Sequence, residues 1–124
     1  MNPHGLGTDV VEIPRFRAVL ERRPAIVGRL FTESEQALAG ERSDGVPALA
    51  VRFAAKESVM KALGVGIGAI RFTDIEITRA LDGPPMVALH GAAAELAAAR
   101  GVTGWMCSLS HGDDVAVATV LALG

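Results

Sequence analysis

The stretch PALAVRFAAKESVMKALG, residues 47–64, decides how this sequence folds, because it is the longest helical candidate in the chain. Pro47 suits the first turn of a helix, and Gly64 is the residue type that most often ends one. Apolar side chains recur between them at helical spacing and predict one buried face, formed by Leu49, Phe53, Met60 and Leu63. The pattern therefore predicts a long helix over residues 47–63 that packs against the core.

A neighbouring stripe of the same helix combines small and charged residues. At about 100° per residue, one narrow line holds Ala50, Ala54, Glu57 and Lys61. The alanines would let another backbone approach, which leaves a shallow polar slot suited to a phosphate with a divalent cation. Alternatively, Glu57 and Lys61 form an ordinary helix-surface pair worth about 0.3 kcal/mol. The helix alone leaves both interpretations open.

Upstream, the apolar segment 4–13 predicts a first strand that contains one acid, Asp9. An acid among apolar strand residues, just after the flexible stretch GLGT (5–8), is poorly explained as core or as solvated surface. With Glu57 it would supply two oxygen ligands to a hard cation and leave positions for water and a substrate phosphate, a pattern that suits Mg²⁺. A zinc site is not expected, because the chain has one Cys and three scattered His.

The remaining segments alternate irregularly between helices and strands. Helices are predicted over 15–23, 25–31, 33–40 and 91–100, the third opened by a capping box of Thr32 and Glu35. Strands are predicted over 72–78, 86–90, 105–110 and 115–123, with a turn over 81–85 and a hairpin through 111–114. Several strand connections look like hairpins. We therefore expect an α+β fold, one domain over residues 1–124, with a mostly antiparallel sheet and one long helix.

Composition excludes several classes of protein. The 124 residues are 50% hydrophobic and 21% charged, with a formal net charge of -2. No uncharged apolar run approaches the roughly 18 residues that span a bilayer, and Asp9 and Glu12 interrupt any signal peptide, so neither a membrane protein nor a secreted one is expected. A mildly acidic chain with few aromatics is not expected to bind nucleic acid. The single Cys107 favours a cytoplasmic location.

Positive charge gathers in one segment, residues 14–30, which holds five arginines and one glutamate. This arginine segment forms a local basic patch on an acidic protein, which suits an acidic protein partner better than a polyanion. The competing interpretation is a solvated helix face without a partner.

Two other patterns are weaker than they look. The glycines of 64–68 resemble part of a dinucleotide-binding fingerprint, but they follow a helix instead of opening one after a strand. Residues 108–113 contain the Ser, His and Asp of a hydrolase triad. Their crowding within one hairpin makes a working arrangement of nucleophile, base and orienting acid unexpected.

The ordered motifs of the chain resemble the small holo-acyl-carrier-protein synthases. Their order and spacing agree from one end of the chain to the other, and five blocks in sequence are far more specific than any one of them. The blocks are GLGTDVVEI (5–13) with RF (15–16), RLFT (29–32) with Glu35, RFAAKES (52–58), KALG (61–64) and SLSH (108–111).

The resemblance implies a 4′-phosphopantetheinyl transferase fold and activity. Such an enzyme moves the phosphopantetheine arm of coenzyme A onto a serine of an apo acyl carrier protein and releases 3′,5′-ADP. Mg²⁺ dependence and a homotrimer with active sites between subunits are also implied. The choice between a fatty-acid and a polyketide carrier stays open.

Site roles follow from position in the family's motifs. Asp9 and Glu57 would bind the metal, and Lys61 would contact the diphosphate, which makes these three the catalytic candidates. Glu57, directly or through a metal-bound water, is the candidate to take the proton of the attacking serine. The coenzyme A positions are Arg52, Lys61, Gly64, Pro85 and His111. The carrier contact is Arg15, and we expect Arg22 and Arg29 of the arginine segment to act with it.

Two other functions stay open beside the transferase. One is a noncatalytic module that binds a carrier protein or a nucleotide through the arginine segment and the glycine turn. The other is a hydrolase that releases the product of coenzyme A, or of another diphosphate, to water.

Overall fold

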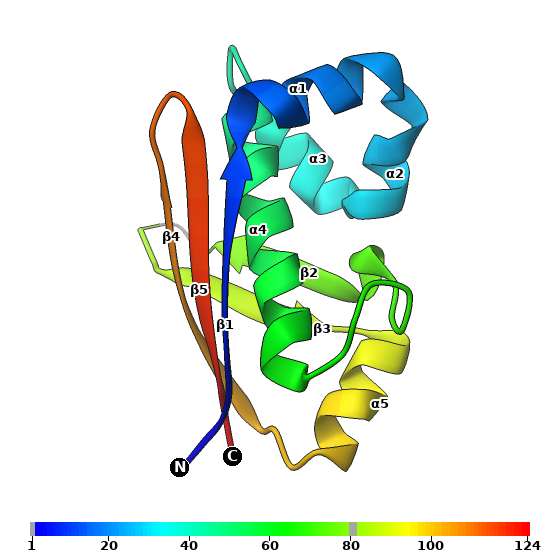
Figure 1. Cartoon of the computed structure of the whole chain (residues 1–124), viewed down its shortest axis with the longest axis vertical. Coiled ribbons are helices and arrows are strands. Elements are labelled where there is room, and N and C mark those ends of the chain that lie inside the picture. Colours follow the sequence, from blue (N-terminus) through cyan, green and yellow to red (C-terminus); the bar gives the residue numbers. More distant parts are fainter. Residues whose placement is uncertain (1, 80–81) are drawn as a thin grey trace.

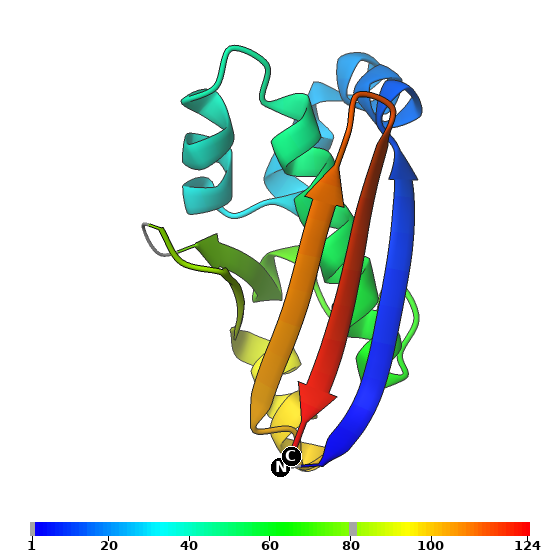
Figure 2. The ribbon, with the colours of Figure 1, turned by 90° about the vertical axis from the view of Figure 1, so that its left-hand side faces the viewer.

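A computed structural model describes residues 2–79 and 82–124 of the chain. Its main body is an antiparallel sheet of three strands in the order β1 (Pro3–Glu12), β5 (Val115–Leu123) and β4 (Gly104–His111) (Figure 1). The long helix α4 (Val46–Leu63) runs along one face of this sheet. The opposite face points toward the viewer in Figure 2, where no helix of the described residues covers it. The predicted α+β class with antiparallel strands and one long helix is confirmed.

α4 is the centre of the core. Thirteen of its eighteen residues are buried, and the helix ends, as predicted, at Gly64 with a left-handed φ of 73°. Apolar residues on nearly all sides are typical of a helix that other elements surround. The three-stranded sheet covers one side of α4, and helices that precede it in the chain pack against another side (Figure 1).

Two glycines bring β1 against α4. A Cβ atom at Gly7 would lie 1.9 Å from the Ser58 carbonyl oxygen, and one at Gly5 would lie 1.9 Å from that of Ala62. The predicted stripe residues Ala50 and Ala54 are fully buried, and the two glycine contacts lie just beyond them along the helix, at Ser58 and Ala62. Small residues on both partners, rather than on the helix alone, set the spacing.

The helices before α4 follow the predicted pattern with one exception. α1 (Ile13–Arg22) and α3 (Glu33–Gly40) form where expected, and Thr32 and Glu35 make the predicted capping box. The helix predicted over 25–31 is confirmed only in its second half. Residues Pro24–Ile26 form a 3-10 turn, η1, and only Val27–Leu30 form the short helix α2.

A second, smaller sheet replaces part of the single sheet that we expected. β2 (Ile75–Arg79) and β3 (Pro85–Leu89) pair only with each other, and residues Phe72–Asp74 form a 3-10 turn, η2, instead of the start of a strand. Pro85 opens β3 and has no N–H to donate to a neighbouring strand. Within the predicted 81–85 turn, Leu81 lies outside the described residues. The predicted helix α5 (Gly91–Ala99) then leads back to β4.

Candidate active site

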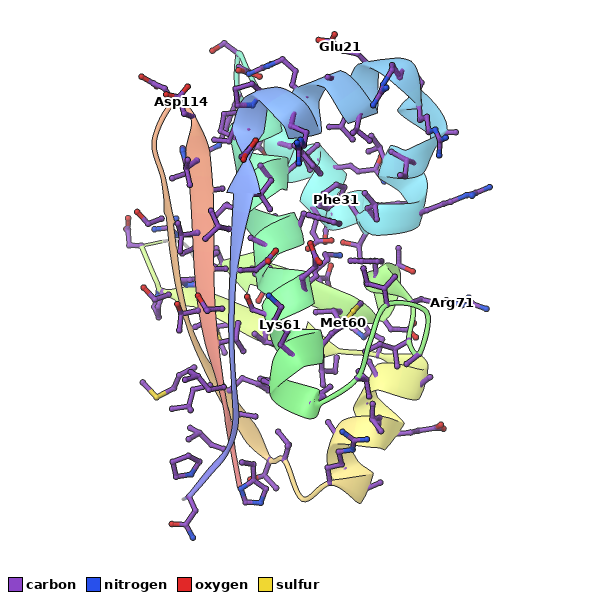
Figure 3. The ribbon with its side chains drawn as sticks, in the orientation of Figure 1. Glu21, Phe31, Met60, Lys61, Arg71 and Asp114 are labelled. Carbon is purple, nitrogen blue, oxygen red and sulfur yellow. The ribbon has the colours of Figure 1, made fainter. Side chains whose placement is uncertain are left out.

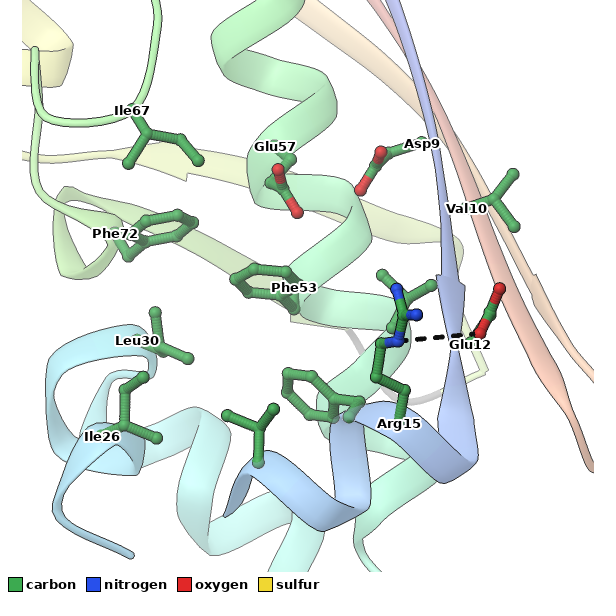
Figure 4. Close-up of a pocket in the computed structure, with 13 residues that line it drawn as sticks. Asp9, Val10, Glu12, Arg15, Ile26, Leu30, Phe53, Glu57, Ile67 and Phe72 are labelled. Carbon is green, nitrogen blue, oxygen red and sulfur yellow. Dashed lines mark ion pairs between the residues drawn. The ribbon is translucent and has the colours of Figure 1, made fainter. Parts of the chain in front are cut away.

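Asp9 of β1 and Glu57 of α4 face one another across the gap between strand and helix (Figure 4). Lys61, one turn after Glu57, donates from Nζ to the Thr8 carbonyl oxygen at 2.8 Å and to Asp9 Oδ1 at 3.2 Å. The Asp9 side chain is only 16% exposed, whereas that of Lys61 is 53% exposed. The glycines that bring β1 against α4 thus also bring together the three predicted catalytic candidates.

Asp9 and Glu57 place two carboxyl groups close together in a partly buried position. Burial, followed by the charge and hydrogen bonding of Asp9, raises the pKa of Glu57 to about 7, although the Lys61 ammonium acts in the opposite direction. Like charges that crowd together favour either a shared proton or a cation between them. A carboxyl group whose pKa lies near neutrality is also suited to exchange protons at physiological pH.

A cavity of about 440 Å³ opens beside the two carboxylates. Its walls are largely apolar, with the rings of Phe53 and Phe72 stacked at 5.4 Å between centroids. Arg15 of α1 stands at the rim, 3.9 Å from Glu12 and strongly exposed (Figure 4). The cavity therefore joins an acidic end to an apolar interior and a basic edge.

The donor set agrees with a hard divalent cation. Within residues 2–79 and 82–124, no group of three or more His, Cys, Asp or Glu side chains is placed to hold a metal. Asp9 and Glu57 alone would leave most coordination positions to water and to a ligand's oxygens, which Mg²⁺ tolerates and structural zinc does not.

Three of the predicted coenzyme A residues meet at a second place. Arg52, Pro85 and His111 line one small cavity of about 80 Å³, together with two arginines that the sequence analysis missed, Arg42 and Arg79. These two lie in a loop and a strand with no pattern that marks them, and only the fold brings them to Arg52. None of the described lining residues is acidic.

Arg52 has the least usual surroundings in this cavity. The residue is only 6% exposed, and its Nη1 donates a hydrogen bond to the Ala48 carbonyl oxygen at 3.0 Å. Burial lowers the pKa of the guanidinium, and Arg42 and Arg79 lower it further, although Glu35 acts in the opposite direction. Its buried Nε has no hydrogen-bond partner among the residues that the structure describes. A buried cation with an unpaired donor beside two more cations is typical of an anion site.

The last predicted coenzyme A residue, Gly64, lies elsewhere. It lines a third cavity of about 410 Å³ with Lys61 and Arg100, and Arg100 Nη1 lies 3.2 Å from where a Gly64 Cβ would stand. The predicted coenzyme A residues are thus divided between two separate cavities of one chain.

The predicted partner residues are spread along the arginine segment. Besides Arg15 at the rim, Arg22 lines a hollow with Arg23, and Arg29 lines a groove beside residues 67–74. Arg17 is engaged within the chain, since both of its terminal nitrogens donate to Asp44 at 3.0 and 2.7 Å. No helix in the described part of the chain is long and apolar enough to cross a membrane.

Comparisons with known proteins agree with this arrangement. A model of the 4′-phosphopantetheinyl transferase superfamily matches residues 5–120. A holo-[acyl-carrier-protein] synthase of Streptomyces coelicolor is 48% identical over 120 residues, which cover 97% of each chain. The crystal structure of the synthase from Neisseria meningitidis superposes with a TM-score of 0.89 at 32% identity, covering 99% of this chain and 100% of the other.

A further solved relative bears on the ligand. The synthase of Helicobacter pylori, solved in complex with coenzyme A, matches with a TM-score of 0.83 at 29% identity, covering 95% of this chain and 99% of the other. Sequence and structure lead to the same group of enzymes over nearly the whole length of the chain. This chain therefore belongs to the holo-[acyl-carrier-protein] synthases of the 4′-phosphopantetheinyl transferase superfamily.

Proposed function

We propose that this chain, as one domain, transfers the 4′-phosphopantetheine group of coenzyme A to a serine of an apo acyl carrier protein. The names of its relatives and the coenzyme A complex of one of them support the reaction. The single observation that carries the proposal is the cluster of Asp9, Glu57 and Lys61 at the end of an open cavity. A noncatalytic binding module would not require two converging carboxylates and a lysine at this place.

Mg²⁺ is the cation that we assign to this cluster, held by Asp9 and Glu57. When bound, it would offset negative charge on the diphosphate. The two carboxylates come from different elements, so the metal would also tie β1 to α4 at this point.

The chain's own side chains have three tasks in the transfer. The serine oxygen forms a bond to the β-phosphorus of coenzyme A while the bond from that phosphorus to the bridging oxygen breaks, and 3′,5′-ADP leaves with the electron pair. Glu57 lines the cavity through which the serine enters and is the residue that accepts the serine proton. Lys61 offsets charge on the diphosphate, and Asp9 holds Lys61 in place at 3.2 Å. Positioning does most of the work in phosphoryl transfer.

The cationic cavity around Arg52 is the site that we assign to the nucleotide end of coenzyme A, with Pro85 and His111. A phosphate there would pair with Arg52 and with the two arginines that the sequence analysis missed, Arg42 and Arg79. Gly64 and Lys61, in the other cavity, would face the diphosphate.

Assembly into a homotrimer with active sites between subunits, as the family resemblance implies, would explain why these residues are divided. The open face of the three-stranded sheet carries exposed apolar side chains on two strands, Leu6 and Val10 on β1 and Met106 on β4. Exposed apolar faces of this kind are typical of subunit interfaces. A neighbouring copy would bring its Arg52 cavity to the Glu57 cluster of this chain.

The acidic carrier protein would dock on the arginine segment, with Arg15 at the cavity rim and Arg22 and Arg29 beyond it. Arg17 is not among the residues that we assign to this role, and it forms an ion pair with Asp44 within the chain. The cytoplasmic location favoured by the sequence stays a prediction.

Intact mass spectrometry tests the proposal. An apo carrier protein incubated with this protein, coenzyme A and Mg²⁺ should gain the mass of one phosphopantetheine arm. The gain should be lost with EDTA and with an Asp9→Ala variant. Tight carrier binding without any mass gain, on fatty-acid and polyketide carriers alike, would favour the binding module. Release of phosphopantetheine from coenzyme A without an acceptor would favour the hydrolase.

A further inference from the structure

A groove of about 900 Å³ lies on the far side of the Glu57 cavity from α1. It is lined by Arg29 of α2, by residues 67–74 and by Ala92 of α5. Arg71, the second cation of the groove, stands at the edge of the molecule away from the three-stranded sheet (Figure 3). Arg71 lies outside every motif identified in the sequence.

The groove is positively charged. Neither Arg29 nor Arg71 makes an ion pair with any described residue. Asp74 is the acid that lines it, and this carboxylate faces Gly91 in the first turn of α5, where the helix dipole favours negative charge. Two exposed guanidinium groups therefore remain available to an acidic ligand.

An exposed apolar side chain connects the groove to the reacting groups. Ile67 is 72% exposed, more than any other large hydrophobic side chain among the described residues. Ile67 and Phe72 line both the groove and the cavity that holds Asp9 and Glu57. The two hollows thus adjoin one another at Ile67 and Phe72. An apolar anchor beside arginines is the composition expected of a protein contact.

The path of the acceptor serine indicates which protein covers the groove and the cavity rim. A serine that reaches Glu57 enters through the cavity, so the protein around that serine has to lie on the cavity rim. Arg15 forms the rim on the α1 side, and Ile67 forms it on the groove side. A partner folded around the serine therefore contacts both sides at once.

We propose that Ile67 and Arg71, with Arg29, form a second docking surface for the acidic carrier protein, across the cavity from Arg15. The inference rests on the proposed transfer, because that reaction brings the serine of the carrier protein to Glu57. Ile67 packs against apolar side chains beside the serine, and Arg71 pairs with a carboxylate of the partner.

Steady-state kinetics with Arg71→Ala test the assignment. The KM for the carrier protein should rise about tenfold, the effect of one well-placed contact, while the KM for coenzyme A stays unchanged. Arg71→Lys should recover part of the loss, and the carrier affinity of Arg71→Ala should depend less steeply on salt. Ile67→Ala should raise the KM for the carrier without changing its salt dependence.

Glu95→Gln is the matched control, since it changes one exposed charge on α5 and lines none of these cavities. It should leave both KM values as they are. The proposal is overturned if Arg71→Ala leaves the KM for the carrier within twofold of the parent, or raises both KM values equally. Should the parent show no transfer at all, the proposed function fails. Fluorescence titration of apo carrier onto both proteins then decides the docking surface alone, through a loss of binding or its absence.

Discussion

Lys56 Nζ lies 2.6 Å from Glu35 Oε1, and both side chains are fully buried. Lys56 also donates to the Phe72 carbonyl oxygen at 3.0 Å, and Glu35 Oε2 accepts from the Ile77 backbone N–H at 3.0 Å. The capping box places Glu35 Oε1 on the Thr32 N–H as well. This pair therefore ties α3, α4 and β2 together and fixes the carbonyl of a residue that lines the Glu57 cavity.

Replacing Lys56 should be far more damaging than replacing both members of the pair. Lys56→Met leaves a buried carboxylate without its counter-ion, which should cost about 3–5 kcal/mol of the free energy of unfolding. Adding Glu35→Gln removes that charge and should recover part of the loss. Urea denaturation of the three proteins measures both effects. A loss below about 1 kcal/mol in Lys56→Met would contradict the role of the pair.

Gly7 should not tolerate a side chain. A Cβ atom would lie 1.9 Å from the backbone oxygen of Ser58, so either β1 or α4 must move. We expect Gly7→Ala to lower the free energy of unfolding by at least about 2 kcal/mol. Gly28→Ala in α2, where a Cβ meets nothing within 4 Å, is the matched control and should be neutral or stabilising. Equal thermal midpoints for the two variants would show that β1 is not seated on α4 as described.

The helix α4 and its contact with β1 show which features local sequence patterns can predict and which they cannot. Helical spacing, Pro47 and Gly64 predict α4 because its periodicity and ends are local properties of the chain. The Asp9 and Glu57 pairing was also predicted, since an acid within an apolar strand needs an unusual neighbour. The contact itself depends on Gly7, whose meaning appears only once β1 lies on α4.

Charged contacts between residues far apart in the chain could not be predicted from the sequence, because they too depend on how the elements pack. Glu35 looks like an ordinary first-turn acid, and nothing near it in the chain indicates that it meets Lys56 in the core. Arg42 and Arg79 gain their role only from their distance to Arg52 in the folded protein. Local patterns predicted the elements and the main carboxylates, whereas contacts across more than one element required the structure.

Glu76 should make the stability of the protein depend on acid pH. Hydrogen bonds from Ser34 first, then from His90 and Thr32, lower the pKa of its carboxyl group. A lowered pKa stabilises the folded state above the ordinary value near 4.5, and this contribution is lost as the pH falls through the folded-state value. We therefore expect Glu76→Gln to be less stable than the parent at pH 7, with the difference shrinking toward pH 3. Thermal unfolding across this range measures it, and a difference independent of pH would contradict the assignment.

Replacing Arg52 should weaken the binding of coenzyme A without lowering the stability of the fold. Because burial disfavours its charge and no described residue pairs with its Nε, Arg52→Met replaces a buried cation with an apolar side chain and should leave the thermal midpoint unchanged or higher. If the cavity holds a phosphate of coenzyme A, the same variant should raise the KM for coenzyme A about tenfold or more. The KM for the carrier protein is the internal reference. A lower midpoint with an unchanged KM for coenzyme A would make Arg52 structural only.

The proposed division of the site between two chains predicts that inactive variants complement one another. Glu57→Gln lacks the proposed base, and Arg52→Met lacks the nucleotide contact, so each alone should transfer poorly. When the two are unfolded together and refolded in equal amounts, about a quarter of the interfaces in a trimer receive Glu57 from one chain and Arg52 from the other. Activity should recover in that proportion, because those interfaces hold one complete site.

Two controls accompany this experiment. The chain that carries both substitutions should recover nothing. Leu6→Glu placed in both partners should abolish recovery, since it puts a charge on the open sheet face. Failure to recover, when the parent refolds to full activity, would place the whole site within one chain.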